Sequence, residues 1–111
     1  MIEKKIREYL KKILDIPVYL EEPETIPDEY IIVEKVGSGV RNYIQSAMIA
    51  VQSYSTSMSN TIDLNERVKT AMLEAITEPY ITKVSLNSDY NFTDTETKRY
   101  RYQAMFDVTF Y

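Results

Sequence analysis

The chain has 111 residues, 44% of them apolar, with a formal charge of −4 and no cysteine, histidine or tryptophan. This length and apolar content predict a single folded domain. Because thiol and imidazole groups are missing, the usual zinc sites, disulfide frameworks, haem or iron–sulfur ligation and Cys- or His-based nucleophiles are excluded, and we expect no enzyme, no metal and no cofactor.

The first predicted element is an amphipathic helix near the start of the chain. Most of its charged side chains lie away from one apolar stripe, whose members are three or four residues apart: Ile2, Ile6, Leu10 and Ile13. The helix is expected to end before Pro17, and residues 18–20 are predicted to form a short strand. Residues 21–27 contain two prolines and three glutamates, which predicts an exposed acidic loop.

A hairpin is predicted next. Residues 30–36 are rich in β-branched side chains and predict a strand, and residues 37–39, Gly-Ser-Gly, supply the positive-φ positions of a tight turn. Apolar side chains then alternate over residues 42–54, which predicts a long second strand. A helix is the alternative interpretation of that stretch, but the preceding glycines and the following serines favour the strand.

The second helix is predicted from cap candidates in residues 57–60 and from a stripe with steps of four: Leu64, Val68, Met72 and Ile76. It is expected to end at Pro79. Residues 81–86 predict a strand, residues 87–97 a polar connection, and residues 99–111 a long strand with one aromatic-rich face expected to be core. The predicted fold class is α+β, a largely antiparallel sheet of four to five strands with two helices packed on one face.

The net charge is unevenly distributed. Residues 1–14 carry +3, residues 15–35 carry −6 and the remainder carries −1. A basic start followed by an acidic segment suggests attraction within the chain or between subunits, although solvated faces are the simpler interpretation. No apolar run approaches membrane-spanning length, so we expect no membrane association, and the charged N-terminus is unlike a signal peptide.

Three short motifs have simpler interpretations than a binding site. Residues 37–39 lack the third glycine of a dinucleotide fingerprint and join two predicted strands. Residues 89–100 resemble a calcium loop at the first, third and fifth places only, with Asp94 in place of the required glycine. The acids of residues 21–29 lack any evident geometry for a divalent ion, so a solvated loop is favoured.

Residues 98–102, Lys-Arg-Tyr-Arg-Tyr, interleave bases with aromatics on a predicted strand, as sheet platforms that stack nucleotides do. The acidic net charge and the absence of the expected glycines count against this interpretation. Tyr100 and Tyr102 are in phase with Phe106 and Phe110, so their face is expected to be core. A nucleic-acid-binding module therefore remains an alternative only.

Protein contacts suit this composition better. Ten tyrosines are present, and tyrosine is enriched in interface cores because it buries a large ring and keeps its hydroxyl wet. Residues 89–97 carry Tyr90 and Phe92 among polar neighbours. If that segment protrudes as a loop, a partner is expected to cover its aromatics.

Residues 88–95, 98–104 and 106–107 resemble the ending of tail terminator or tail completion proteins of long-tailed bacteriophages and prophages of Gram-positive bacteria. Residues 17–23 and 30–39 also resemble that group, so the likeness covers most of the chain. The resemblance implies an α+β virion subunit that forms a sixfold ring at the head-proximal end of the tail, after assembly in the host cytoplasm. It allows the free chain to be monomeric until a tail is present.

The resemblance also implies partners: a second copy of the chain, the tail tube protein and the head–tail connector protein, with DNA passing through the ring without specific binding. A ring contact joins two unlike patches. We expect arginines to pair across subunits with acids, namely Arg41, Arg99 and Arg101 with Glu21, Glu22, Asp28 and Glu29. We expect the aromatic segment to meet the tail tube through Tyr90, Asn91, Phe92 and Asp94. A head-completion or stopper subunit and a small cofactorless enzyme are the remaining alternatives.

Overall fold

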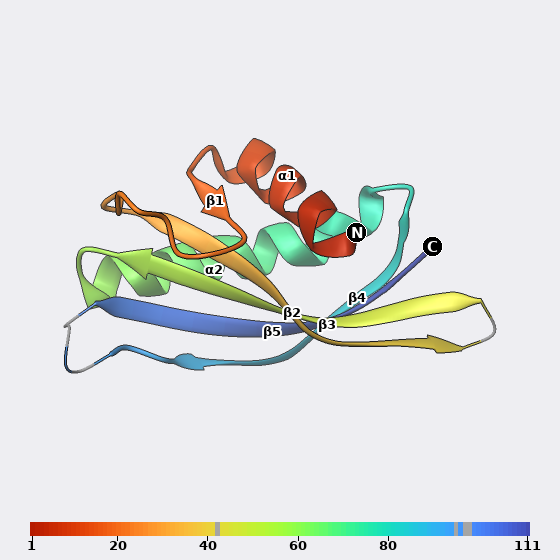
Figure 1. Cartoon of the computed structure of the whole chain (residues 1–111). Coiled ribbons are helices and arrows are strands. Elements are labelled where there is room, and N and C mark those ends of the chain that lie inside the picture. The colour runs from red at the N-terminus through yellow and green to blue at the C-terminus, as the bar shows by residue number, and fades with distance from the viewer. Residues whose placement is uncertain (42, 95, 97–98) are drawn as a thin grey trace.

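A computed structural model describes residues 1–41, 43–94, 96 and 99–111, and it shows one mixed sheet with two helices packed on one face (Figure 1). The elements are α1 (Ile2–Leu14), β1 (Val18–Tyr19), β2 (Tyr30–Arg41), β3 (Ile44–Ser55), α2 (Met58–Glu74), the 3-10 turn η1 (Ala75–Thr77), β4 (Ile81–Asn91) and β5 (Tyr100–Phe110). The five strands lie in the order β1-β2-β3-β5-β4. The predicted α+β class is confirmed, and the predictions made for residues 42, 95, 97 and 98 lie outside the described residues.

Helix α1 forms where the apolar spacing predicted it. Four of its five buried residues are Ile2, Ile6, Tyr9 and Leu10, and the fifth is Leu14 in place of the predicted Ile13, which is exposed. Leu14 follows Leu10 by four residues, so it continues the stripe across the last turn. Asp15 then adopts a left-handed conformation that ends the helix before Pro17, as predicted.

Helix α2 begins at a side-chain cap. The Ser57 hydroxyl accepts a hydrogen bond from the Asn60 backbone N–H at 3.1 Å, which satisfies one of the free donors of the first turn. Leu64, Val68 and Met72 are buried as predicted. The α-helix ends at Glu74, earlier than Pro79, and Ile76 lies exposed in η1 because the tighter turn rotates it out of the stripe.

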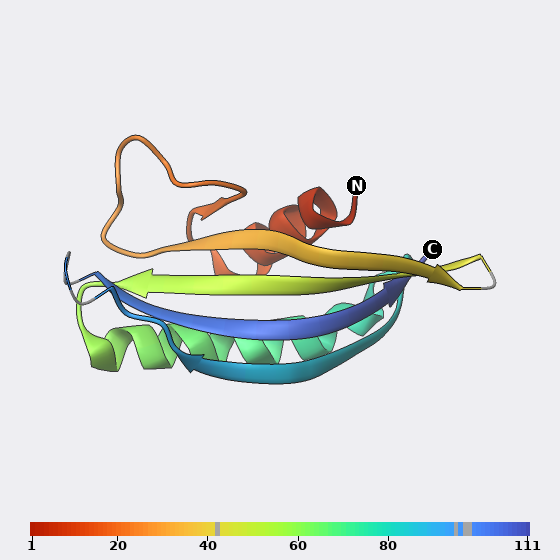
Figure 2. The ribbon, with the colours of Figure 1, turned by 60° about the horizontal axis from the view of Figure 1, so that its bottom comes forward.

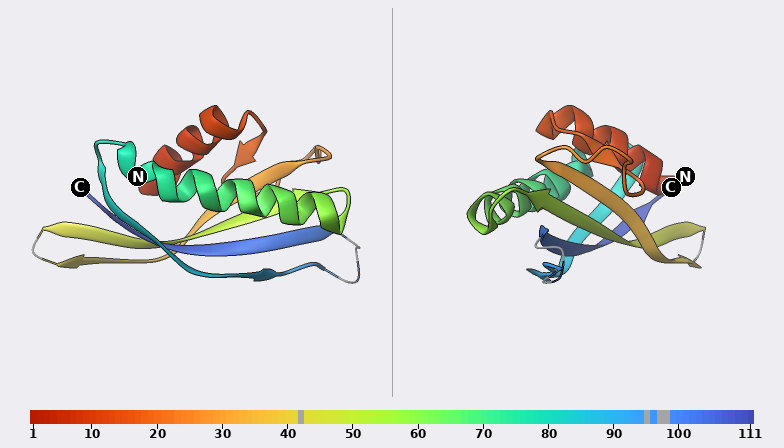
Figure 3. Two further views of the ribbon diagram at one scale, coloured as in Figure 1. Left: turned by 180° about the vertical axis from the view of Figure 1, so that it is seen from behind. Right: turned by 60° about the vertical axis from the view of Figure 1, so that its left-hand side comes forward.

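The central pairing of the sheet joins β3 to β5 in antiparallel register. Ile49 lies opposite Phe106 and Val51 opposite Ala104, and all four are fully buried beneath the helices. The next residue along each strand points to the other face because side chains alternate. Figure 3 shows the two layers from behind and from one end, with both helices on the same side of the sheet. The aromatic-rich face of β5 is therefore core, as predicted.

The β2–β3 hairpin exists, but its turn is not at the glycines. Both strands continue past Gly37 and Gly39 to the terminal pair Arg41–Ile44, and neither glycine has a positive φ. The pairing register shifts between Lys35 and Gly37, so the start of the glycine-containing segment forms a β-bulge. The left-handed residue near the turn is Tyr43, with φ of 67°. The prediction of a turn at residues 37–39 is therefore wrong, because these residues are paired with β3.

The fourth strand is longer than predicted. Residues 87–91 were expected to belong to a polar connection, but they pair with β5 as the second half of β4. Tyr90 and Asn91 are therefore strand residues. Past the end of β4, Phe92 N–H still bonds to the Arg101 carbonyl, and Asp94 and Arg99 form an isolated antiparallel bridge. Main-chain bonding to β5 and a register shift between Leu86 and Ser88 keep this polar stretch in the sheet, although its sequence lacks β-branched residues.

Asp89 links β4 to α2. Its Oδ2 atom accepts hydrogen bonds from Asn65 Nδ2 and from Lys69 Nζ, both at 3.0 Å. Lys69 also forms an ion pair with Glu66 at 2.8 Å. Hydrogen bonds from Lys69 to Glu66 and Asp89 raise the pKa of this lysine above its ordinary value. The second half of β4 is thus held beneath the helix by polar contacts.

We predict that Ser57→Ala lowers the free energy of unfolding by about 1 kcal/mol, since it removes the cap but no packing. For a domain of this size, the thermal midpoint should fall by roughly 4–8 °C. Ser59→Ala is the matched control, because Ser59 is exposed in the same first turn and its change should stay within about 0.5 kcal/mol. Equal midpoints for the two variants in a calorimetric scan would contradict the assignment of the cap.

Candidate protein interface

The face of the sheet opposite the helices is the candidate interface, and we call it the open face. The helices lie behind the sheet in Figure 2, which leaves this face in front. Along β3 and β5 it carries the paired residues Gln52–Gln103 and Tyr54–Arg101, each one step out of phase with the core pairs. On the neighbouring strand, Tyr30 lies opposite Tyr54.

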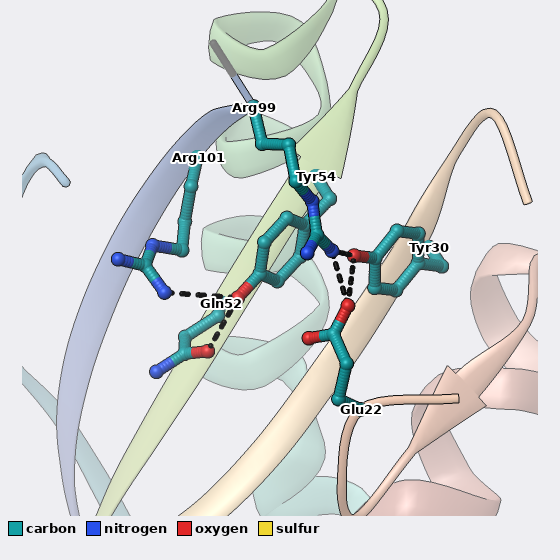
Figure 4. A network of polar contacts seen from close by, with 6 residues as sticks. All are labelled: Glu22, Tyr30, Gln52, Tyr54, Arg99 and Arg101. Atoms are coloured by element: carbon teal, nitrogen blue, oxygen red, sulfur yellow. Dashed lines mark hydrogen bonds and ion pairs between the residues drawn. The ribbon is translucent and has the colours of Figure 1, made fainter. Parts of the chain in front are cut away.

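Two tyrosines and an arginine form the centre of this face (Figure 4). The rings of Tyr30 and Tyr54 are stacked, with centroids 4.5 Å apart and planes 3° from parallel. The Arg99 guanidinium lies 5.2 Å from the Tyr54 ring centroid and 5.9 Å from that of Tyr30. Such an arrangement combines ring stacking with cation–π attraction.

Glu22, from the acidic loop, contacts Arg99 and Tyr30. It forms an ion pair with Arg99, which also donates to the Tyr30 hydroxyl, and the Tyr30 hydroxyl donates to Glu22 Oε1 at 2.9 Å. Residues far apart in sequence are thereby joined, so the loop is anchored to the open face. We call Glu22, Tyr30, Tyr54, Arg99 and Arg101 the tyrosine–arginine cluster.

Arg101 extends the cluster toward the end of β4. Its Nε donates to the Phe92 carbonyl at 2.8 Å, one Nη donates to the Tyr54 hydroxyl at 3.0 Å, and the guanidinium lies 4.2 Å from the Phe92 ring centroid. The Tyr54 hydroxyl in turn donates to Gln52 Oε1 at 3.0 Å, and Gln52 Nε2 donates to Gln103 at 2.9 Å. A continuous polar chain therefore crosses the middle of the sheet.

Tyr54 is buried, with only 5% of its surface exposed. Burial raises the pKa of its hydroxyl above the ordinary value of 10.0, while the hydrogen bond from Arg101 acts in the opposite direction and is outweighed. The neutral hydroxyl is thus favoured, and it can both donate to Gln52 and accept from Arg101.

Tyr90 and Phe92 form an exposed aromatic corner beside the cluster. Their rings meet edge to face with centroids 5.8 Å apart, and the two residues are 42% and 43% exposed. Gln103 Nε2 donates to the Tyr90 hydroxyl at 2.5 Å. Beyond the corner, the Asn91 and Asp94 side chains accept from the backbone N–H groups of Thr93 and Glu96, both at 2.9 Å, which shapes the chain as it leaves β4.

Most of the predicted interface residues gather at one end of the molecule. This end holds the acidic loop, the aromatic corner and the start of β5, with Glu21, Glu22, Asp28, Glu29, Tyr90, Asn91, Phe92, Asp94, Arg99 and Arg101. Arg41 lies apart from them, because it ends β2 at the far tip of the hairpin. The pair between Arg99 and Glu22, expected across subunits, forms within one chain, and the interface role of these residues stays a prediction.

Sequence reasoning missed the members of the open face that come from β2 and β3. Tyr30, Gln52 and Tyr54 stand in apolar or serine-rich stretches, and their partnership depends on the strand register, which the sequence does not show. The strict alternation along residues 42–54 was the available signal, since it separates Tyr54 from the core positions. Tyr100 and Tyr102, which a nucleotide platform would use, are partly buried on the helix side.

Exposed rings and arginines make this end of the open face a candidate for contact between proteins. Across residues 1–41, 43–94, 96 and 99–111, no group of three or more acidic residues is arranged to hold a metal ion, and no helix is both long and apolar enough to cross a bilayer. Exposed aromatic rings beside an anchored arginine pair are typical of interface centres. In searches against known proteins, no family model and no curated protein matches the chain.

We predict a loss of stability on alkaline titration. The pKa values of Tyr9, Tyr54 and Tyr80 are all raised, mainly by burial, so the folded state holds these protons more tightly than the unfolded chain. Their stabilising contribution is complete below about pH 10 and is lost as the pH rises through the raised values. The urea midpoint should therefore fall above pH 10, and the fall should be shallower for Tyr54→Phe. An identical slope for that variant would contradict the buried ionisation of Tyr54.

Proposed function

We propose that the chain is a structural subunit of a long-tailed phage virion, of the tail terminator type. In this proposal, copies form a ring at the head-proximal end of the tail tube, stop tube polymerisation and join the tail to the head connector. The proposal starts from the resemblance of residues 88–95 and 98–104 to that group. The shape of the fold and its exposed surfaces give further support.

The observation that best supports the proposal is that the two ends of the molecule present different surfaces. The long axis measures 44 Å against 25 and 24 Å for the others. One end carries the acidic loop and the tyrosine–arginine cluster, and the other carries the tip of the β2–β3 hairpin with Arg41 (Figures 1 and 2). Unlike ends that match each other give head-to-tail contacts, which close into a ring when the rotation between copies allows it.

The aromatic corner is the surface proposed to meet the tail tube. Tyr90 and Phe92 are exposed yet held in place by Gln103 and Arg101, so little ordering entropy remains to be lost on contact. The net charge of −4 is consistent with a ring that DNA passes without being held.

The direct test is to add the purified chain to polymerising tail tube protein of the same phage. Capped tubes of limited length, each with a ring at one end in negative-stain images, are expected. Uncapped tubes that grow as they do without the chain would contradict the proposal. Binding to the head connector without tube capping would instead indicate the head-completion or stopper alternative.

We predict that Phe92→Ser weakens tube capping at least tenfold while the chain stays folded, because this ring is exposed and central to the proposed contact. Ile76→Ser is the matched control, since Ile76 is a large apolar residue, 53% exposed, in η1 on the helix side of the sheet. Capping is measured as the chain concentration that halves mean tube length. Equal half-maximal concentrations for the two variants would contradict the assignment of the aromatic corner to the tube contact.

A further inference from the structure

The tip of the β2–β3 hairpin exposes apolar side chains that the rest of its own chain does not cover. Val36, Val40, Tyr43 and Ile44 are 48%, 72%, 97% and 47% exposed. We call residues 36–41 and 43–46 the arm. In Figures 1 and 3 the paired ends of β2 and β3 extend past both helices. An apolar projection of this kind marks a contact with another molecule.

Tyr43 is the clearest sign that the tip has a task besides turning the chain. Its φ of 67° is left-handed, a conformation that costs a residue with a Cβ atom about 1–2 kcal/mol and that glycine or asparagine adopts more readily. A large ring therefore occupies a position where the turn alone favours a smaller residue, and it is almost fully exposed there.

The other end of the molecule offers a receiving surface of matching character. A pocket of about 280 Å³ lies between the acidic loop and the start of β5. Its lining combines apolar and aromatic residues with one acid and one base: Ile26, Pro27, Tyr30, Tyr54, Tyr100, Asp28 and Arg99, with Ser55 and Thr56. Ile26 is 49% exposed. Ile26 therefore faces solvent beside the Asp28 carboxylate, whereas Tyr30 and Tyr54 form the nearly buried floor of the pocket.

The arm cannot reach this pocket within one chain. Tyr30 and Arg41 are the two ends of β2, and at about 3.3 Å per residue they are separated by about 36 Å. The two surfaces can meet only between copies.

We propose that the arm of one copy docks in the pocket beside the acidic loop of a second copy, with Tyr43 in the pocket and Arg41 beside Asp28. This proposal rests on the ring assembly of the proposed function and names the contact that builds it. Each copy gives its arm to one neighbour and its pocket to the other, so the contact is head-to-tail.

The charges of the two surfaces are complementary. Arg41 is the only charged residue in the arm, whereas residues 21–29 carry five acids and no base. Glu22 is neutralised by Arg99, and among the described residues Asp28 has no ion-pair partner. Opposite charges at the rim of an apolar contact favour the correct partner and orientation.

Association through the strand edges is less suited to these copies. The pairing of edge strand β4 shifts register twice, between Ile81 and Lys83 and between Leu86 and Ser88, and β2 is bulged between Lys35 and Gly37. Bulges of this kind twist an edge away from regular pairing with another strand. The contact is therefore assigned to side chains at the tip of the hairpin.

The absence of cysteine allows a direct test by crosslinking. A chain carrying both Tyr43→Cys and Ile26→Cys is treated with a short bismaleimide, free and on capped tail tubes. A ladder of covalent oligomers up to the closed ring is expected, while each single variant gives no product beyond a dimer. Capped tubes without a ladder would overturn the docking and leave the proposed function standing. A ladder without capping would support the docking and contradict the proposed function.

Three variants keep the test independent of folding. Tyr43→Asn should preserve the turn, because asparagine tolerates the left-handed conformation, and should weaken association between copies about 30-fold, as expected for loss of a central aromatic anchor. Arg41→Asp should weaken association, and Asp28→Arg in the same chain should restore it. Unchanged association in Tyr43→Asn, measured by sedimentation or by the crosslinked yield on tubes, or failure of the charge exchange to restore it, would overturn the proposal.

Discussion

The antiparallel register between β3 and β5 is the constraint on which the rest of the structure depends. It places Ile49 against Phe106 under the helices and, an odd number of residues further along each strand, Tyr54 against Arg101 on the open face. Because side chains alternate, a slip of one residue would move the core pair to solvent and the polar pair beneath the helices. The hydrophobic core therefore fixes the register, and the candidate interface inherits it.

The tyrosine–arginine cluster contributes more to shape than to stability. Arg99 and Glu22 are partly exposed, and a pair of that kind is worth about 0–1 kcal/mol. Ring stacking of Tyr30 on Tyr54 adds about 0.5–1.5 kcal/mol beyond the buried area. These weak interactions join the acidic loop to the sheet. They therefore fix the position of the loop's acidic residues relative to β5.

Apolar periodicity was sufficient for the presence of both helices and for the fold class, since the four-residue spacing of Leu64, Val68 and Met72 places them on one buried face. Proline was a weaker guide, because α2 ends at Glu74, before Pro79. The turn was mispredicted because Gly37 and Gly39 permit several conformations, and pairing with β3 selected an extended one. The end of β4 was missed because residues 87–91 are polar and gain their strand conformation from β5. Arg99 and Arg101 were found as candidates, but Tyr30 and Tyr54 join them only through register.

An arm at one end and a pocket at the other create a risk of open-ended association. A contact between unlike surfaces gives a filament unless the geometry closes it. A weak single contact lowers that risk, because free chains that can form only one such contact remain mostly monomeric. A tail tube that holds several copies together would raise their effective concentration and so favour the contact there. In the proposed contact, desolvation of Arg41 and Asp28 lowers the net affinity of each single contact. Under the proposed function, the same features that weaken the dimer restrict assembly to the end of the tube.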